Sequence, residues 1–87
     1  MSKYTRISEI EQELAECNQD DLNQYTYREG HHYKGYAKSA LKHGIGVFTW
    51  PNKKAKYIGE FRKDFRHGFG KLIQTDGSVY VGFWKND

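Results

Sequence analysis

The sequence has few of the side chains that fill an ordinary protein core. Hydrophobic residues make up 37% of its 87 residues, below the roughly 45–50% of ordinary globular chains, a reference that also counts glycine. Its one cysteine, Cys17, cannot form an internal disulfide and fits a reducing compartment. No apolar run approaches the ~18 residues of a membrane-spanning helix. The composition therefore argues against membrane-spanning and disulfide-held proteins.

Targeting signals are also missing from the start of the sequence. The first residues hold no apolar stretch, so a secretory signal is not expected. Acidic residues crowd the segment from Glu9 to Asp21, whereas mitochondrial presequences are poor in acid. Ser2 follows the methionine, so the N-myristoylation pattern is absent. We therefore expect a cytoplasmic protein, or one bound to a structure that the cytosol touches.

Aromatic residues and glycine are what the sequence has in quantity. Seven Tyr, five Phe and two Trp bring the aromatic fraction to 16%, and there are nine Gly. Disordered chains are poor in aromatics, whereas aromatic cross-strand pairs stabilise β-sheets. The composition therefore predicts a folded chain that is mainly β.

A repeat of 23 to 24 residues runs through residues 33–87. The segment YKGYAKSALKHGIG at 33–46 is identical to YIGEFRKDFRHGFG at 57–70 in five of fourteen positions, and a third copy begins at Tyr80. Each copy alternates as a strand does, so that Tyr57, Gly59 and Phe61 share one face. Repeated glycine weakens a strand, so we expect an aromatic ring to lie over each bare backbone. Tight turns at 63–64 and 76–77 then make each copy one β-hairpin.

This pattern resembles the MORN repeat (membrane occupation and recognition nexus), which reads Y-x-G-x-[FW]-x-x-G-x-x-H-G-x-G before a strand and a D-G turn. The resemblance implies an antiparallel β-hairpin solenoid over residues 25–87, with units starting at Tyr33, Tyr57 and Tyr80. Residues 1–24 would form an N-terminal α-helix and a polar connection. The positions that define the repeat in this sequence are Tyr33, Gly35, His43, Gly44, Gly46, Tyr57, Gly59, Phe61, His67, Gly68, Gly70, Gly77, Tyr80, Gly82 and Trp84.

The sequence departs from this pattern at several positions. Ala40, Asp64 and Asp87 stand where the family has a glycine in the middle of the hairpin, and Ala37 stands where an aromatic is expected. Residues 51–54 replace the D-G turn and are one residue longer. We therefore expect the first unit to be distorted and to lack its aromatic contact.

An amphipathic helix is predicted before the repeats. It would begin between residues 6 and 9, capped by Ser8 with Glu11 or by Thr5, and end near Cys17. A helix this short is not stable alone, so it docks either on its own sheet or on a partner. The apolar stripe that would make this contact comprises Ile7, Ile10 and Leu14, with Cys17 at its end.

Chemistry-bearing residues do not combine into a catalytic, cofactor or metal site. His43 and His67 occupy equivalent positions two strand spacings apart, roughly 10 Å, too far to share one zinc ion. Cys17 lies on an acidic helix, where a thiolate is disfavoured. Phosphate-binding loops and nucleophile elbows are missing from the sequence. We therefore expect a protein that is not an enzyme and needs no cofactor.

Charge is divided unevenly, with a net −4 over residues 1–32 and +7 over residues 33–87. The basic part could meet anionic lipid, or only keep an aromatic-rich sheet in solution. Nucleic acid is disfavoured, because the aromatics are needed within the sheet. The basic residues proposed to contact anionic lipid are Lys34, Lys38, Lys42, Lys53, Lys54, Arg62, Lys63 and Arg66.

Docking on another protein is the function that the sequence favours. A strand over 80–85 would form a sheet edge, and an unpaired edge invites another chain. The expected partner contacts are Tyr80, Phe83 and Trp84, with the helix stripe as a further contact. The resemblance points the same way, because MORN proteins commonly serve as scaffolds in cytoskeletal, ciliary and membrane-associated assemblies. A second copy of the chain and a different subunit both remain open as partners.

Overall fold

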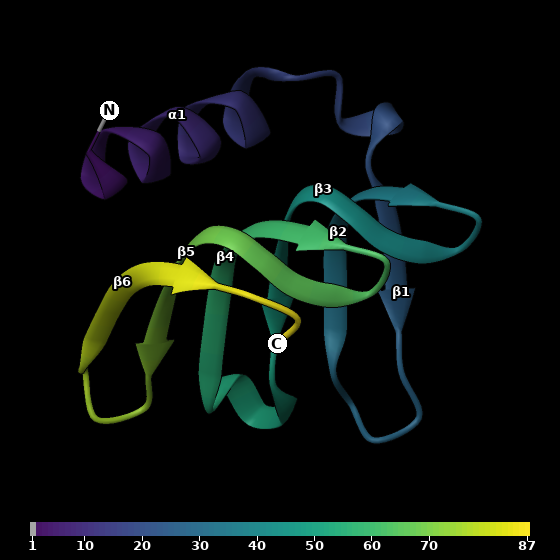
Figure 1. Cartoon of the computed structure of the whole chain (residues 1–87). Helices are drawn as coiled ribbons and strands as arrows, with labels where there is room; N and C mark the ends of the chain where they lie inside the picture. The colour runs from purple at the N-terminus through teal and green to yellow at the C-terminus, as the bar shows by residue number, and fades with distance from the viewer. Residues whose placement is uncertain (1) are drawn as a thin grey trace.

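The computed structural model describes residues 2–87, apart from the side chain of Lys53, and forms one open antiparallel sheet with a helix across one face (Figure 1). The six strands lie side by side in chain order, as a meander of hairpins. Short 3₁₀ turns lie at Gln19–Asp21 and Pro51–Lys53. The helix and strands are α1 (Lys3–Glu16), β1 (Asn23–Thr26), β2 (His32–Lys38), β3 (Leu41–Thr49), β4 (Ala55–Arg62), β5 (Phe65–Gln74) and β6 (Val79–Trp84).

Helix α1 begins earlier than the sequence predicted. Ser2 is the N-cap, and its Oγ accepts a hydrogen bond from the backbone N–H of Thr5 at 3.1 Å. Serine is among the best N-cap residues, so the predicted start between residues 6 and 9 and the cap at Ser8 are wrong. The predicted end near Cys17 is confirmed, because Cys17 is the C-cap. No helix of the described residues is long and apolar enough to cross a membrane.

The helix docks on its own sheet. Ile7 and Ile10 are 4% and 0% exposed and pack with Ile45 and Ile58, while Leu14 lies partly buried against the same cluster. Two ion pairs flank this apolar contact. Arg6 Nε donates to Glu60 Oε1 at 2.7 Å, and Lys71 Nζ lies 3.6 Å from Glu11 Oε2. The prediction that Ile7 and Ile10 contact a partner is therefore wrong, because both side chains are buried in the chain's own core.

The opposite face of the sheet holds an aromatic core built on tyrosine and glycine. Tyr33 and Tyr57 are fully buried, and Phe61 is only 5% exposed. The Tyr33 ring occupies the space where a side chain on Gly46 would lie, and Tyr57 does the same over Gly70. The prediction that rings cover the bare glycine backbone is confirmed. Burial raises the pKa of both tyrosines well above the ordinary value of 10.

Hairpin turns repeat more faithfully than the sequence does. Ala40, Asp64 and Asp87 have φ angles of 64°, 80° and 69°, the left-handed region that glycine adopts without strain. The strand register shifts at the same place in both complete hairpins, after Gly35 and after Gly59. The predicted distortion is therefore absent from the β2–β3 hairpin, whose turn and register follow the second unit. The first unit departs from the second only after β3, where a 3₁₀ turn at Pro51–Lys53 replaces the D-G turn.

The missing aromatic of the first unit is replaced from the preceding strand. In the second unit, Tyr57 meets Phe61 edge to face, with ring centroids 5.1 Å apart. Ala37 cannot make this contact with Tyr33. Tyr33 meets Phe61 of the next unit edge to face at 5.2 Å, and Tyr25 of β1 stacks on Tyr33 at 6.2 Å with nearly parallel rings. Strand β1 begins at Asn23, two residues before the predicted sheet boundary. This extra strand therefore covers the end of the aromatic core.

Substituting alanine for Gly70 tests the tyrosine–glycine contact. The added β-carbon would overlap the Tyr57 ring, and overpacking a core costs about 3 kcal/mol. The matched control is Gly77→Ala, because Gly77 has φ +88° but no atom near its open side, so only a backbone cost of about 1 kcal/mol is expected. Urea unfolding of both variants checks the difference. Equal losses of unfolding free energy would show that the ring does not set the packing.

Candidate docking surface

Asp64 and Asp87 each tie a turn to the preceding hairpin, and we call each of these contacts a clasp. Asp64 Oδ1 accepts the backbone N–H of Lys42 at 3.2 Å and its Nζ at 2.8 Å. One unit later, Asp87 Oδ1 accepts the backbone N–H and the Nε of Arg66, both at 2.9 Å. In both clasps one aspartate oxygen accepts from the backbone N–H and from the side-chain cation of the same basic residue. Aspartate at these positions therefore links neighbouring units, although it departs from the family's glycine.

Asp87 is held in its ionised form by this clasp. Burial alone would raise the pKa of Asp87, but the hydrogen bonds from Arg66 outweigh burial and hold the pKa below its ordinary value. The pair therefore adds stability above the ordinary pKa of an aspartate, and this stability is lost as the pH falls through the lowered value.

Repeat histidines also join neighbouring units. His43 Nδ1 accepts the backbone N–H of Lys63 at 3.2 Å, and His67 Nδ1 accepts that of Asn86 at 3.4 Å. Both histidines thus support the turn of the next hairpin. Among the described residues there is no cluster of three or more histidine, cysteine or acidic side chains able to hold a metal ion.

Lys42 and Arg66 point into the aromatic core. Lys42 is only 9% exposed, and its Nζ lies 5.1 Å from the ring centroid of Phe48 and 5.3 Å from that of Tyr27. Arg66 lies 5.7 Å from the ring of Tyr57. Cations over aromatic faces are attracted by the ring quadrupole. The prediction that Lys42 and Arg66 contact lipid is therefore wrong, because both side chains are already paired inside the molecule.

The remaining predicted lipid contacts do not gather on one surface. Lys38, Arg62 and Lys63 are exposed at hairpin turns. Lys34 and Lys54 instead line a hollow on the face of the sheet that carries α1. The side chain of Lys53 lies outside the described residues. The structure thus divides the predicted basic patch between separate places.

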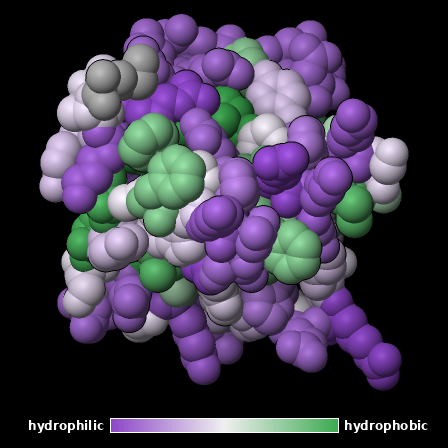
Figure 2. All heavy atoms as spheres, viewed as in Figure 1, coloured by the Kyte–Doolittle hydropathy of each residue, from purple (hydrophilic) through white to green (hydrophobic). Residues whose placement is uncertain are grey.

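Strand β6 forms an uncharged edge of the sheet. It pairs with β5 alone, and Val79, Tyr80 and Phe83 are 54%, 57% and 60% exposed. Trp84 is half-buried, and its ring centroid lies 5.1 Å from that of Tyr57. Hydrophobic side chains interrupt the hydrophilic surface on the left of Figure 2, the side on which β6 lies in Figure 1. The predicted contacts Tyr80, Phe83 and Trp84 are therefore all on this edge strand, with Tyr80 and Trp84 on the aromatic face and Phe83 against Phe69 on the opposite face.

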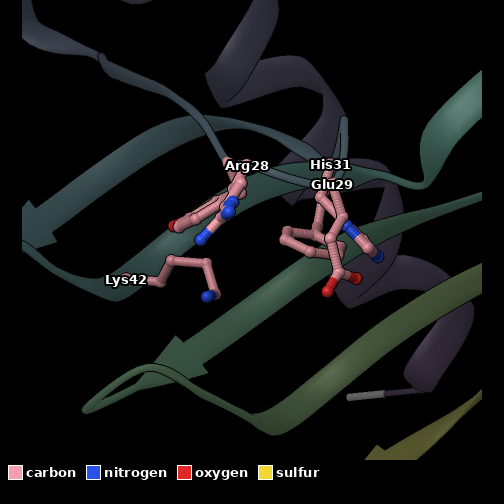
Figure 3. A pocket seen from close by; sticks show the side chains of 6 residues that line it. Arg28, Glu29, His31 and Lys42 are labelled. Carbon is pink, nitrogen blue, oxygen red and sulfur yellow. The ribbon is translucent and has the colours of Figure 1, made fainter.

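Sequence reasoning missed a hollow of about 410 Å³ beside the turn between β1 and β2. Figure 3 shows Arg28 and Lys42 on one side of it and Glu29 and His31 on the other. Tyr27 and Phe48 complete the lining. Residues 28–31 belong to a turn without a motif, so only the folded sheet brings them next to Lys42 and Phe48. Charges of both signs make this hollow poorly selective for a charged ligand.

Two stretches of the sequence, residues 33–54 and 57–79, match the MORN repeat. They coincide with the hairpins β2–β3 and β4–β5, and together they cover more than half of the chain. The chain belongs to the MORN-repeat family. Members of this family often take part in protein or membrane interactions and are generally non-enzymatic.

One relative is MORN repeat-containing protein 3 of Xenopus laevis. The two sequences are 34% identical over an alignment of 64 positions, and the match covers 67% of this chain and 27% of the relative. The chain thus spans well under two thirds of that relative's length. The shared part supports the MORN repeat, and the rest of the relative has no counterpart in this comparison.

Two glycine substitutions at equivalent turn positions test the clasp. Asp64→Gly keeps a residue suited to the left-handed backbone but leaves buried Lys42 without its acceptor, so we expect a loss of about 1–3 kcal/mol. Ala40→Gly removes no carboxylate and relieves a φ of 64°, so we expect a gain of about 1 kcal/mol. Urea unfolding measures both. A gain in both variants would contradict the clasp.

Proposed function

We propose that this MORN-repeat chain is a non-enzymatic docking subunit that joins a larger protein assembly through the β6 edge and its aromatic side chains. The observation behind the proposal is the exposure of Tyr80. It occupies the repeat position of Tyr33 and Tyr57, which are fully buried, yet it is 57% exposed. The third unit lacks the strand that would cover it within the described chain.

The two edges of the sheet differ in a way that favours β6. Edge strands are commonly protected by being short, or by charged side chains or proline. Strand β6 has neither, and every residue from Val79 to Trp84 is uncharged. Strand β1, at the other edge, is only four residues long and largely polar. A partner strand that adds to a sheet edge gains backbone hydrogen bonds together with side-chain pockets.

The repeat defines what such a strand must present. Tyr57 pairs with Leu72 while Gly59 pairs with Gly70, and the first hairpin follows the same rule with Phe48 and Gly46. A strand that completes the third unit would therefore place glycine opposite Gly82 and a bulky apolar residue opposite Tyr80. On this proposal the partner's strand pairs with β6 and extends the sheet. The partner's strand can come from another subunit or from a second copy.

Anionic lipid binding is the weaker alternative. Lys42 and Arg66 are paired with Asp64 and Asp87, so they do not face outward. Each basic residue near an anionic surface contributes about 1 kcal/mol, and of the other predicted lipid contacts with described side chains only Lys34 and Lys54 lie together, at the hollow on the α1 face. A cytosolic place in a cytoskeletal or ciliary assembly is part of our proposal, and the family resemblance alone supports it.

Charging the β6 edge tests the proposal. We expect Val79→Lys combined with Phe83→Lys to abolish stoichiometric capture of partner proteins from native lysate. Both side chains are more than half exposed, so the variant should fold. The matched control is Gln24→Lys on the opposite edge, which should capture as the unmodified chain does. A wash at about 0.5 M salt screens exposed charge pairs and leaves apolar docking intact.

Two outcomes would contradict docking through β6. If the doubly charged variant still captured its partners, the docking surface would have to lie elsewhere on the chain. Loss of all protein in the salt wash, with only anionic lipid bound beforehand, would favour the lipid alternative. Circular dichroism and urea unfolding of each variant separate lost docking from lost folding.

A further inference from the structure

Helix α1 covers only part of the sheet face on which it lies (Figure 1). The uncovered part contains a hollow of about 510 Å³ whose lining comes from β2, β3, β4 and β5 and the turn before β4. Its floor includes Val47 and Ile73, which also pack against the apolar core beneath α1. The hollow therefore continues the surface that already binds a helix.

The charges around this hollow have one sign. Lys34, Lys54 and Lys56 line it, and no acidic side chain of the described chain does so. None of these lysines has a carboxylate within 4 Å among the described residues, in contrast to Lys42 and Lys71. Unpaired cations beside an apolar floor are complementary to a segment that combines apolar and acidic side chains.

Contacts of α1 show how this face holds such a segment. Lys34, Val47, Ile58 and Lys71 form one row across four strands, from β2 to β5. At one end of the row, Lys71 meets Glu11 of α1 at 3.6 Å while the helix packs its isoleucines on the sheet. At the other end, Lys34 has the same kind of apolar neighbour, Val47, but no carboxylate. Helix α1 therefore contacts the Ile58–Lys71 half of the row, and the Lys34–Val47 half has no acidic partner among the described residues.

We propose that this hollow docks an acidic amphipathic segment of a partner protein. The segment packs apolar side chains on Val47 and Ile73, and its carboxylates pair with Lys34, Lys54 and Lys56. This contact is independent of the β6 edge, because it lies on the face of the sheet and uses charge. Salt weakens it more than it weakens the edge contact, because exposed charge pairs are screened.

Peptide titration of the full chain tests the proposal. The probe is a synthetic acidic helix-forming peptide with leucines at i, i+3, i+4 and i+7 and glutamates between them. Amide NMR shifts should change at Lys34, Val47, Lys56 and Ile73. The same peptide with glutamine in place of glutamate should bind at least about tenfold more weakly, because it lacks the charges.

A pair of lysine variants makes the test specific. Lys34→Gln combined with Lys56→Gln should lower the affinity for the acidic peptide by about tenfold or more. The control, Lys38→Gln with Lys63→Gln, removes the same charge at hairpin turns and should bind as the unmodified chain does. Urea unfolding of both variants shows that they are folded.

Four results would overturn the inference. These are no binding of the acidic peptide, equal binding of the glutamine peptide, equal weakening by both lysine pairs, and shifts confined to β6. Displacement of the peptide by inorganic phosphate or by vesicles rich in phosphatidylserine would assign the hollow to a phosphate group instead. Because the titration does not involve β6, its failure leaves the edge-docking proposal standing.

Discussion

A buried tyrosine ring lying across a glycine of the next strand sets the spacing of this sheet. Tyr33 over Gly46 and Tyr57 over Gly70 leave no space for a side chain on either glycine. The hydroxyl groups complete the contact, because Tyr33 Oη donates to the carbonyl of Tyr36 at 2.6 Å and Tyr57 Oη to that of Glu60 at 3.0 Å. Flat rings and bare backbone therefore replace the branched aliphatic core that the composition lacks. In the third unit the equivalent tyrosine, Tyr80, is 57% exposed, because no further strand covers it in the described chain.

The two faces of the sheet serve different purposes. On the aromatic face, Lys42 and Arg66 lie among rings and are clasped by the aspartates of the next turn. These cations hold neighbouring units together and are not available to a ligand. On the other face, α1 covers one half with an apolar stripe and leaves the basic hollow beside it. Our two proposals place partners at the β6 edge, which is neutral and apolar, and at the hollow beside α1, which is basic.

Much of the sheet could be predicted from the repeat, and much of the docking surface could not. The alternation of Tyr57, Gly59 and Phe61 predicts that these residues lie on one face of a strand. The turn-forming residues at 63–64 and 76–77 predict where the hairpins turn. The N-cap at Ser2 was missed because Thr5 and Ser8 offer equally good caps. Burial of Ile7 and Ile10 was left open, because an amphipathic stripe fits its own sheet as well as a partner. The hollow was beyond sequence reasoning, because its residues come from several strands.

Hydrogen exchange of the β6 amides, in the free chain and in the captured complex, tests the central claim most directly. Alternate residues of an edge strand direct their N–H groups away from the sheet. We predict that those amides exchange rapidly in the free chain and become protected in the complex, while β4 around Tyr57 is protected in both. A stable complex in which the β6 amides exchange as they do in the free chain would contradict the account.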